Sequence, residues 1–435
     1  MRVCSDGGEM MRVLWLNYGI LPDACVALGY KSEYGGGWLP SMLSALLAAA
    51  PSLEVCVASL DWRRCDVEIG NVHYLSFGGP RIKFTYDRIP ERVQKEVGVL
   101  IAQFNPDIIH VHGTEYYFGC FAPEVYGGKP VVVSIQGLLS GINQHYMGGI
   151  SPKELRGTNL NARFFLKGRT LLSEQTAWRE CRAVQEQKVI RQQRNFIGRT
   201  VWDRDVIQFY NPQARYFTIN ENLRAPFFVT RRNLGVVKSH SIYCGAAAST
   251  AFKGAHWLIR AVAALKGEFP DIELRIAAAD GLHAPKGLKA RMMDQSYHAY
   301  IRRLIKTLGV EGHIVALPIL SAEEVAKELS RAELFVLPSM CENSPNSLGE
   351  AMLVGTPAIA TFVGGVPSIL KDGVEGKLVP SGDPAALAGA IRRWFLHPEE
   401  AEHCVEPARA TALKRHDAKA NAEATLAVYN ALTNG

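Results

Sequence analysis

Residues 334–355, LFVLPSMCENSPNSLGEAMLVG, decide the fold of this chain. The apolar run at residues 334–337 predicts a strand buried on both faces, and Pro338 stops it. A polar loop carrying Glu342 follows. A carboxylate therefore stands just beyond the carboxyl end of a parallel-type strand, which is where open α/β sheets bind their ligands.

A helix is predicted directly after this loop. Ser347 opens it, and Gly355 and Pro357 close it. Glu350 stands three positions after Ser347, so that a Ser-x-x-Glu capping box would tie its carboxylate to the helix start. The stretch thus places two carboxylates, Glu342 and Glu350, eight positions apart around one loop.

This pattern resembles the retaining glycosyltransferases of the GT-B fold, in particular family 4, whose signature is a Glu-x7-Glu pair in this setting. The resemblance covers residues 13–432 and is strongest over 323–396. It implies an α/β protein of GT-B architecture, with two Rossmann-like, doubly wound parallel-sheet domains facing across a cleft. It rests on features that occur together in register: the strand, Glu342, residues 344–352, Gly355-Thr356-Pro357 and Gly364-Gly365-Val366-Pro367.

Composition agrees with a soluble globular protein of two domains. The chain has 435 residues, of which 48% are hydrophobic and 21% charged. Its net charge of +6 favours anionic partners such as nucleotides, phosphates or a membrane surface, and no nucleic-acid partner is expected. Nine scattered cysteines without a Cys-x-x-Cys pair fit a reducing cytosol. We expect a cytoplasmic protein, with peripheral contact at the inner membrane surface as an alternative.

Strands and helices alternate along both halves of the chain, which predicts two α/β domains, and the resemblance implies the following roles for five segments. Residues 1–10 are expected to be a disordered lead, 11–221 an acceptor-side Rossmann-like domain and 222–240 a hinge. Residues 241–415 are expected to form the donor domain, and 416–435 a helix crossing back to the first domain. Strands are predicted at 13–17, 53–59, 107–112, 131–135, the start of 196–204, 215–219, 241–245, 274–278, 314–317, 334–337 and 377–379.

A glycine triplet, Gly35, Gly36 and Gly37, separates the first strand from a helix predicted at 38–50. Three glycines let a backbone approach a ligand closely, and the following helix N-terminus favours negative charge. The alternative interpretation is a flexible loop. The resemblance favours the ligand-binding one, because family 4 enzymes carry a glycine-rich loop near donor and acceptor.

Three polar residues of the first half stand at predicted strand ends and are cleft candidates: His112, Gln136 and Arg199. His110, two positions before His112, is interpreted as a satisfied interior histidine. Gln136 occupies the position where the family often has a histidine, so it is expected to position sugar hydroxyls without transferring protons. Arg199 can fork onto a phosphate or carboxylate, or pair with Asp203.

A departing nucleotide diphosphate needs its growing negative charge stabilised. Asp203-Arg204-Asp205 is interpreted as a helix cap and not a metal site, so no metal is expected. Lys253 and backbone N–H groups at a helix N-terminus are the expected substitute. The family pairs an arginine with this lysine, whereas this chain has alanines at 246–248, so Arg224 or Arg199 is the candidate replacement.

The resemblance also implies roles for the residues around the opening stretch. Glu350 would accept hydrogen bonds from both ribose hydroxyls, and Glu342 would face the transferred sugar. Asn346 and Ser347 would meet a sugar hydroxyl or phosphate, and Gly245 and Leu348 complete the donor-binding set.

The predicted function is therefore retaining transfer of a sugar from a UDP- or GDP-sugar to an acceptor hydroxyl, without a cofactor. The acceptor would be a glycan, a lipid-linked molecule or a small molecule, as in polysaccharide biosynthesis. The alternatives are a non-catalytic nucleotide- or sugar-binding protein of the same fold, and another GT-B enzyme such as a nucleotide-sugar epimerase or a phosphorylase.

Overall fold

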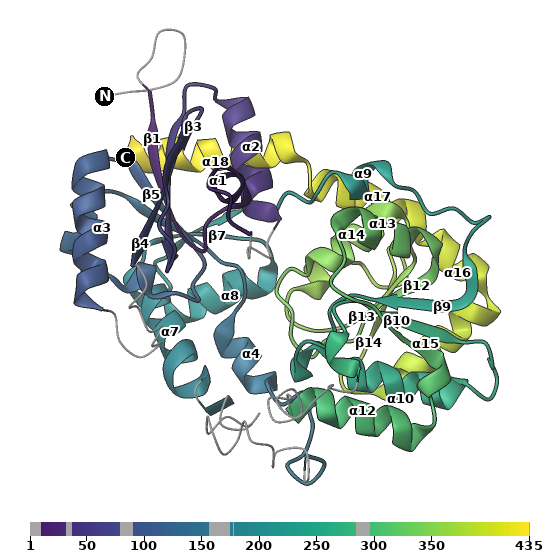
Figure 1. Cartoon of the computed structure of the whole chain (residues 1–435). Helices are drawn as coiled ribbons and strands as arrows, with labels where there is room; N and C mark the ends of the chain where they lie inside the picture. The colour runs from purple at the N-terminus through teal and green to yellow at the C-terminus, as the bar shows by residue number, and fades with distance from the viewer. Residues whose placement is uncertain are drawn as a thin grey trace. The chain divides into compact units, whose positions relative to one another are not determined.

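The structure, a computed structural model, describes residues 10–31, 37–78, 90–155, 175–176, 178–283 and 296–434. Most of the expected lead, together with Gly35 and Gly36, lies outside these ranges. The chain forms two compact units, each built on its own β-sheet (Figure 1). Unit 1 comprises Met1–Ser140, Glu180–Leu223 and His416–Gly435, and unit 2 comprises Gly141–Arg179 and Arg224–Arg415. The predicted α/β class is confirmed.

The sheet of unit 1 has the strand order β3-β4-β2-β1-β5-β6-β7-β8. All neighbouring pairs are parallel except β3 and β4, which form an antiparallel edge. The sequence analysis missed these two edge strands. The bounds are β1 Arg12–Tyr18, β2 Glu54–Asp61, β3 Asp66–Ile69, β4 Val72–Gly78, β5 Ile108–His112, β6 Val131–Ser134, β7 Asn195–Gly198 and β8 Arg215–Thr218.

Helices cover both faces of this sheet (Figure 1). Helices α1, α2 and α18 pack with one hydrophobic core, and α3, α7 and α8 with the other. Their bounds are α1 Pro22–Ala27, α2 Trp38–Ala49, α3 Glu91–Phe104, α7 Ala183–Gln192, α8 Val201–Tyr210 and α18 Ala418–Thr433, with short helices η1 Tyr117–Cys120 and η2 Pro123–Tyr126. Two further helices, α4 Leu139–His145 and η3 Trp178–Arg182, lie where the chain passes between the units.

The C-terminal helix α18 is tied into unit 1 through Tyr429. Trp15 Nε1 donates to the Tyr429 hydroxyl at 3.1 Å, and this hydroxyl lies 2.7 Å from His110 Nδ1. His110 Nε2 lies 2.6 Å from Ser134 Oγ. A hydroxyl can both donate and accept, so the Tyr429 and Ser134 hydroxyls satisfy both ring nitrogens of His110 in either tautomer. His110 is thus a satisfied interior histidine, as predicted.

Unit 2 has an all-parallel sheet of order β11-β10-β9-β12-β13-β14. Helices α10, α12 and α15 pack against one face, and α13 and α14 lie over the other (Figure 1). Its strands are β9 Lys238–Cys244, β10 Glu273–Ile276, β11 Ile314–Ala316, β12 Ala332–Leu337, β13 Ala358–Thr361 and β14 Lys377–Val379.

The helices of unit 2 are α9 Pro226–Val229, α10 Ala255–Leu265, α12 Ser296–Leu308, α13 Ala322–Arg331, α14 Asn346–Val354, α15 Pro384–Leu396, α16 Pro398–His403 and α17 Val405–Arg415. Short helices are η4 Ala251–Lys253, η5 Asp280–Leu282, η6 Glu311–His313 and η7 Val366–Ser368. Helix α9 lies within the expected hinge. No helix in the described part of the chain is both long and apolar enough to cross a membrane.

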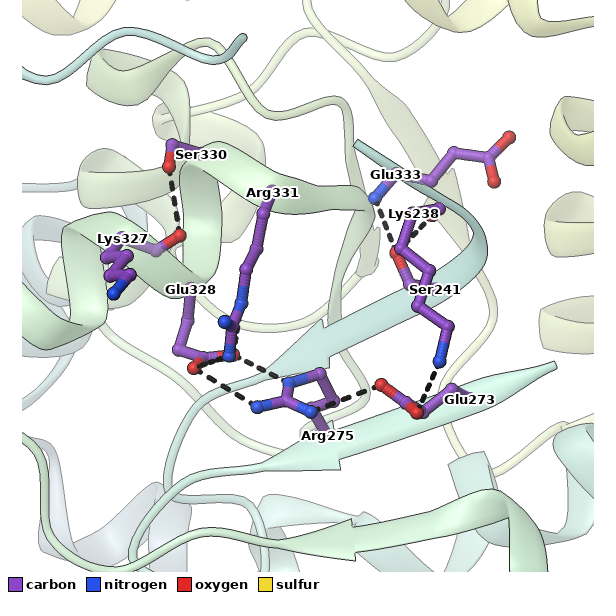
Figure 2. A network of polar contacts seen from close by, with 9 residues as sticks. All are labelled: Lys238, Ser241, Glu273, Arg275, Lys327, Glu328, Ser330, Arg331 and Glu333. Atoms are coloured by element: carbon purple, nitrogen blue, oxygen red, sulfur yellow. Dashed lines mark hydrogen bonds and ion pairs between the residues drawn. The ribbon is translucent and has the colours of Figure 1, made fainter. Parts of the chain in front are cut away.

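A charged network joins strand β10 to helix α13 in unit 2 (Figure 2). Arg275 donates to both carboxylate oxygens of Glu328, at 2.7 and 3.2 Å, and to Glu273 at 3.2 Å. Lys238 at the start of β9 also bonds Glu273, and Arg331 also contacts Glu328. Because Glu328 is buried and the Arg275 and Glu273 side chains are only 20% exposed, their desolvation opposes the ion-pair attraction, and we attribute to the network the alignment of α13 on the sheet and little net stability.

The first half of the sequence contributes a segment to the core of unit 2. Tyr146, Ile150 and Leu155 are buried in that core. The carbonyl of Gly148 accepts from His256 Nε2 at 2.9 Å and from Trp257 Nε1 at 3.1 Å, both on helix α10. A carbonyl only accepts, so Nε2 carries the proton of this histidine.

Candidate functional site

The loop after β12 and the turn before α10 are locked together, and this places Lys253. Met340 N–H donates to the Phe252 carbonyl at 2.7 Å. Gly254 has φ +78°, and a Cβ at this position would collide with the Pro338 carbonyl oxygen. A glycine is therefore required for the two segments to lie this close.

Glu342 and Lys253, the two predicted catalytic residues, form a direct ion pair. Lys253 Nζ lies 2.7 Å from Glu342 Oε1, which also accepts from Ser339 Oγ at 2.7 Å. The Gly365 N–H donates to the Glu342 carbonyl at 3.0 Å, so the predicted Gly-Gly-Val-Pro turn supports the loop. Only 8% of the Glu342 side chain is exposed, against 33% for Lys253. The ammonium is thus the accessible member of the pair.

Helix α14 begins at Asn346 and has Pro345 at its N-cap, two residues before the predicted cap Ser347. No side chain caps it, so the capping box expected between Ser347 and Glu350 is wrong. Gly355 ends the helix in the left-handed conformation, φ +89°, as predicted. Asn346 Oδ1 is buried without a hydrogen-bond partner among the described residues. Among the described residues, this end of α14 thus has first-turn N–H groups without intrahelical partners and an unsatisfied amide oxygen.

Glu350 is held by Arg224. Arg224 Nη2 lies 3.0 Å from Glu350 Oε1, and 10% of the glutamate side chain is exposed. Burial raises the pKa of Glu350, and the charge of Arg224 acts in the opposite direction. Arg224 thus opposes part of the desolvation that burial imposes on this carboxylate.

The other predicted donor-binding residues lie at the same edge of the unit 2 sheet. Gly245 directly follows β9, and a Cβ built on it would lie 3.7 Å from Ser347 Cβ. Leu348 is fully buried and anchors α14. Thr250, next to the Lys253 turn, has a buried hydroxyl with no partner in the ranges the structure describes. The sequence analysis did not select Thr250.

In unit 1, Arg199 is a structural arginine that fixes the end of β6. Its guanidinium pairs with Glu221 and donates to the carbonyls of Ile135 and Gln136, the latter at 2.8 Å. Asp203 forms a capping box with Thr200 at the start of α8, which confirms the predicted cap. Arg199 is buried.

His112 ends β5 as predicted, but only 2% of it is exposed. It lines a cavity of about 30 Å³ together with Trp38, Arg199 and Asn220. Neither ring nitrogen of His112, nor Asn220 Oδ1, has a hydrogen-bond partner among the residues described. A cavity this small, with these unsatisfied polar atoms, suits one or two water molecules.

Of the predicted glycine triplet, the structure describes Gly37, which is the N-cap of α2 with φ −75°.

Sequence reasoning missed Glu115, three residues beyond β5. Its Oε1 accepts from Gly137 N–H at 3.1 Å, beside Gln136. Burial, reinforced by the charge of Glu186, raises the pKa of Glu115 to about 7. Gly113, with φ +102°, makes room for this carboxylate. The sequence feature that could have identified Glu115 was its position just after a strand of alternating apolar and histidine residues.

Together, the edge of unit 2 offers an ammonium, unsatisfied amide and hydroxyl groups, and two carboxylates. The ammonium and the hydroxyl can donate to a phosphate-bearing ligand, whereas the Asn346 Oδ1 and the carboxylates accept from hydroxyl groups. The structure describes no group of three or more His, Cys, Asp or Glu side chains arranged to hold a metal.

Comparison with known proteins agrees with this chemistry. Residues 231–411 match the family model for glycosyl transferases group 1. Two similar sequences are D-inositol 3-phosphate glycosyltransferases from Streptomyces coelicolor and Corynebacterium glutamicum, 31% and 32% identical over 176 and 162 residues. These matches cover 39% and 37% of this chain, and 36% and 37% of the relatives. The match thus spans little more than a third of those relatives' length.

Similar solved structures cover almost the whole chain. Sucrose-phosphate synthase from Thermosynechococcus elongatus has a TM-score of 0.66 at 15% identity, covering 97% of this chain and 99% of that one. Anabaena HepE in complex with UDP and glucose has a TM-score of 0.63 at 16% identity, covering 97% and 100%. The glycosyltransferase WaaG has a TM-score of 0.62 at 14% identity, covering 97% and 100%. The chain therefore has the fold of the GT-B glycosyltransferases, and its residues 231–411 match the glycosyl transferases group 1 family.

Proposed function

We propose that this chain is a glycosyltransferase that moves a sugar from a nucleotide-diphosphate sugar to an acceptor hydroxyl. The observation that carries the proposal is the Lys253–Glu342 ion pair, which lies at the carboxyl edge of the unit 2 sheet beside the start of α14. The group 1 family match over 231–411 supports it. A UDP-sugar is favoured as donor because HepE was solved with UDP and with UDP-glucose, and a GDP-sugar is the alternative.

In the proposed reaction the leaving diphosphate is stabilised by groups of this chain, without a metal. The Lys253 ammonium supplies the positive charge, and the first N–H groups of α14 supply hydrogen bonds along the helix dipole. The Thr250 hydroxyl, which has no partner among the described residues, can donate to the diphosphate and completes this set, whereas the unsatisfied Asn346 Oδ1 would accept from a sugar hydroxyl. These interactions strengthen as charge grows on the diphosphate, which is what lowers the barrier.

Glu342 acts at the sugar in this scheme. Lys253 and Ser339 fix its carboxylate, so it is preorganised to face the positive charge that forms at the anomeric carbon. We propose retention of configuration, in the manner of family 4, with the leaving phosphate oxygen taking the acceptor's proton. No side chain of this chain is then needed as a dedicated base, in agreement with glutamine at position 136.

The acceptor is proposed to be a glycan or a lipid-linked molecule, as in polysaccharide biosynthesis. Gln136 would position a hydroxyl, and Arg199 would act only by holding the Gln136 backbone. Peripheral contact with the inner membrane surface, which the basic net charge favours, would bring a lipid-linked acceptor to the protein.

A second candidate is a nucleotide-sugar-binding protein without activity. It is favoured by the alanines at 246–248, where the family has a second cation, and by Gln136. The two candidates differ in turnover, so a single assay separates them.

The test is release of nucleotide diphosphate from a panel of UDP- and GDP-sugars, with and without acceptor oligosaccharides. We expect the wild type to turn over one donor and Glu342→Ala to lose about 100-fold or more in rate, because charge stabilisation at the reacting centre is removed. Glu311→Ala, at an exposed glutamate of the same unit, is the control and should match the wild type. Turnover unaffected by Glu342→Ala would refute the assignment, and binding without turnover would favour the second candidate.

A further inference from the structure

Arg224 pairs with the carboxylate of Glu350 in unit 2, whereas its charge first suggests a phosphate ligand. The sequence left open whether Arg224 or Arg199 replaces the missing phosphate-binding cation. Arg199 lies in unit 1, where it is buried against Glu221. Arg224 is the first residue of the second segment of unit 2 and points its guanidinium at Glu350.

The position of Arg224 is fixed at its backbone and at its head. Its carbonyl accepts from the Phe227 N–H at 3.3 Å, at the start of α9, and Phe227 is fully buried. The guanidinium carbon lies 5.2 Å from the centroid of the Phe227 ring, within cation–π range. Although 39% of the Arg224 side chain is exposed, it is therefore held over Phe227 and does not sweep freely through solvent.

Glu350 depends on this partner. Arg224 is its one hydrogen-bond partner in the described part of the chain, and it binds Oε1 alone. Tyr243 on β9, which lies near Glu350, carries no charge that could take the place of Arg224. Removing one member of a buried ion pair leaves an uncompensated charge, so moving Arg224 onto a phosphate would strand Glu350.

We propose that Arg224 is a positioning residue that orients Glu350 as the acceptor for the ribose hydroxyls of the donor, leaving Oε2 for the ligand. This inference rests on the proposed function, because it assumes a nucleotide at this edge of unit 2. It assigns Arg224 to the nucleoside end of the donor and leaves the diphosphate to Lys253 and the N–H groups of α14.

The test compares ligands that carry the ribose hydroxyls with ligands that lack them. Binding of UDP, GDP, 2′-deoxy-UDP, 2′-deoxy-GDP and inorganic pyrophosphate is measured by calorimetry for the wild type, Arg224→Gln and Arg224→Lys. For the better ribonucleotide we expect Arg224→Gln to weaken binding about 10- to 100-fold, the loss of one or two hydrogen bonds to a charged group. For the matching deoxynucleotide the loss should be several-fold smaller, and pyrophosphate affinity should not change.

Arg224→Lys should recover part of the lost affinity, since it restores the charge without the planar fork. The control is Arg231→Gln, a nearby arginine paired with Glu406 at 2.7 Å, which should bind all ligands as the wild type does. Equal losses for the ribonucleotide and pyrophosphate would overturn the inference and make Arg224 a phosphate ligand. Equal losses for ribo- and deoxynucleotide would also overturn it. A wild type that binds neither UDP nor GDP would instead refute the proposed function, and this inference with it.

Discussion

Glu342 and Glu350 are the same residue type in one unit, yet their surroundings fit them for different tasks. Glu342 is paired with an accessible ammonium and with Ser339. Glu350 is buried against a single guanidinium, with one oxygen left over. The first arrangement suits the proposed fixed charge at the transferred sugar, and the second suits the proposed acceptor for ribose hydroxyls.

Glu115 gives the clearest pH dependence of stability in unit 1. Its pKa is raised from 4.5 to about 7 by burial, so between these values the folded protein binds a proton that the unfolded chain does not. Stability contributed by the protonated form is present at pH 5 and lost as the pH rises through 7. Relative to Glu115→Gln, which stays neutral, the wild type should lose about 2.5 kcal/mol between pH 5 and pH 8.

Urea denaturation of both proteins at pH 5 and pH 8 measures this difference directly. Glu124→Gln, an exposed glutamate in the same unit, should shift stability equally at both pH values. A gap between the wild type and Glu115→Gln that is the same at pH 5 and pH 8 would show that Glu115 ionises normally.

At the level of elements, the strand, loop and helix around Glu342 could be predicted because their signals are local. An apolar run, a proline stop and a closing glycine gave β12, the loop and the end of α14. The helix start was misplaced because Ser347 matches a capping box, while Pro345, which is compatible with an N-cap, was overlooked. The β3–β4 edge was missed because β3 has only four residues, two of them acidic, and β4 interrupts its apolar residues with His73 and Ser76.

The turn η4 depends on Gly254, which gives a prediction for this element. Gly254→Ala adds a Cβ that collides with the Pro338 carbonyl in addition to the strain at φ +78°. We expect it to destabilise unit 2 by about 2–4 kcal/mol, of which about 1 kcal/mol is the left-handed backbone alone. It should also displace Lys253 from Glu342 and lower donor affinity.

The matched control is Gly373→Ala, at φ +71° with nothing within 4 Å of the added Cβ. It isolates the backbone cost, so it should be the milder change in thermal denaturation and leave donor affinity intact. If both substitutions had the same effect, the close approach at Gly254 would not hold Lys253 in place.

At the scale of the whole molecule, neither unit is a continuous stretch of sequence. The C-terminal helix α18 packs into unit 1 through the Trp15–Tyr429–His110 contacts. Tyr146, Ile150 and Leu155, from the first half of the sequence, pack into the core of unit 2. In both cases apolar side chains are buried against residues that are distant in the sequence, and a local sequence pattern does not predict such contacts.

The same reason explains which site contacts the sequence could not supply. Lys253 and Glu342 were selected from motifs, but their direct pairing spans 89 positions, and that of Arg224 with Glu350 spans 126. Arg199 was identified as a strand-end arginine, yet its partner Glu221 follows a different strand, β8. The sequence could therefore predict which residues belong to the candidate site, but only the folded structure shows which residues they pair with.

The central claim is that unit 2 binds the diphosphate of a nucleotide donor through Lys253. Calorimetric titration of UDP and GDP into the wild type, Lys253→Ala and the exposed control Lys371→Ala tests it most directly. We predict micromolar binding of one nucleotide to the wild type and to Lys371→Ala, and binding at least about tenfold weaker to Lys253→Ala, from loss of a charge-assisted hydrogen bond. Equal affinity for the wild type and Lys253→Ala, or binding of neither nucleotide, would contradict the claim.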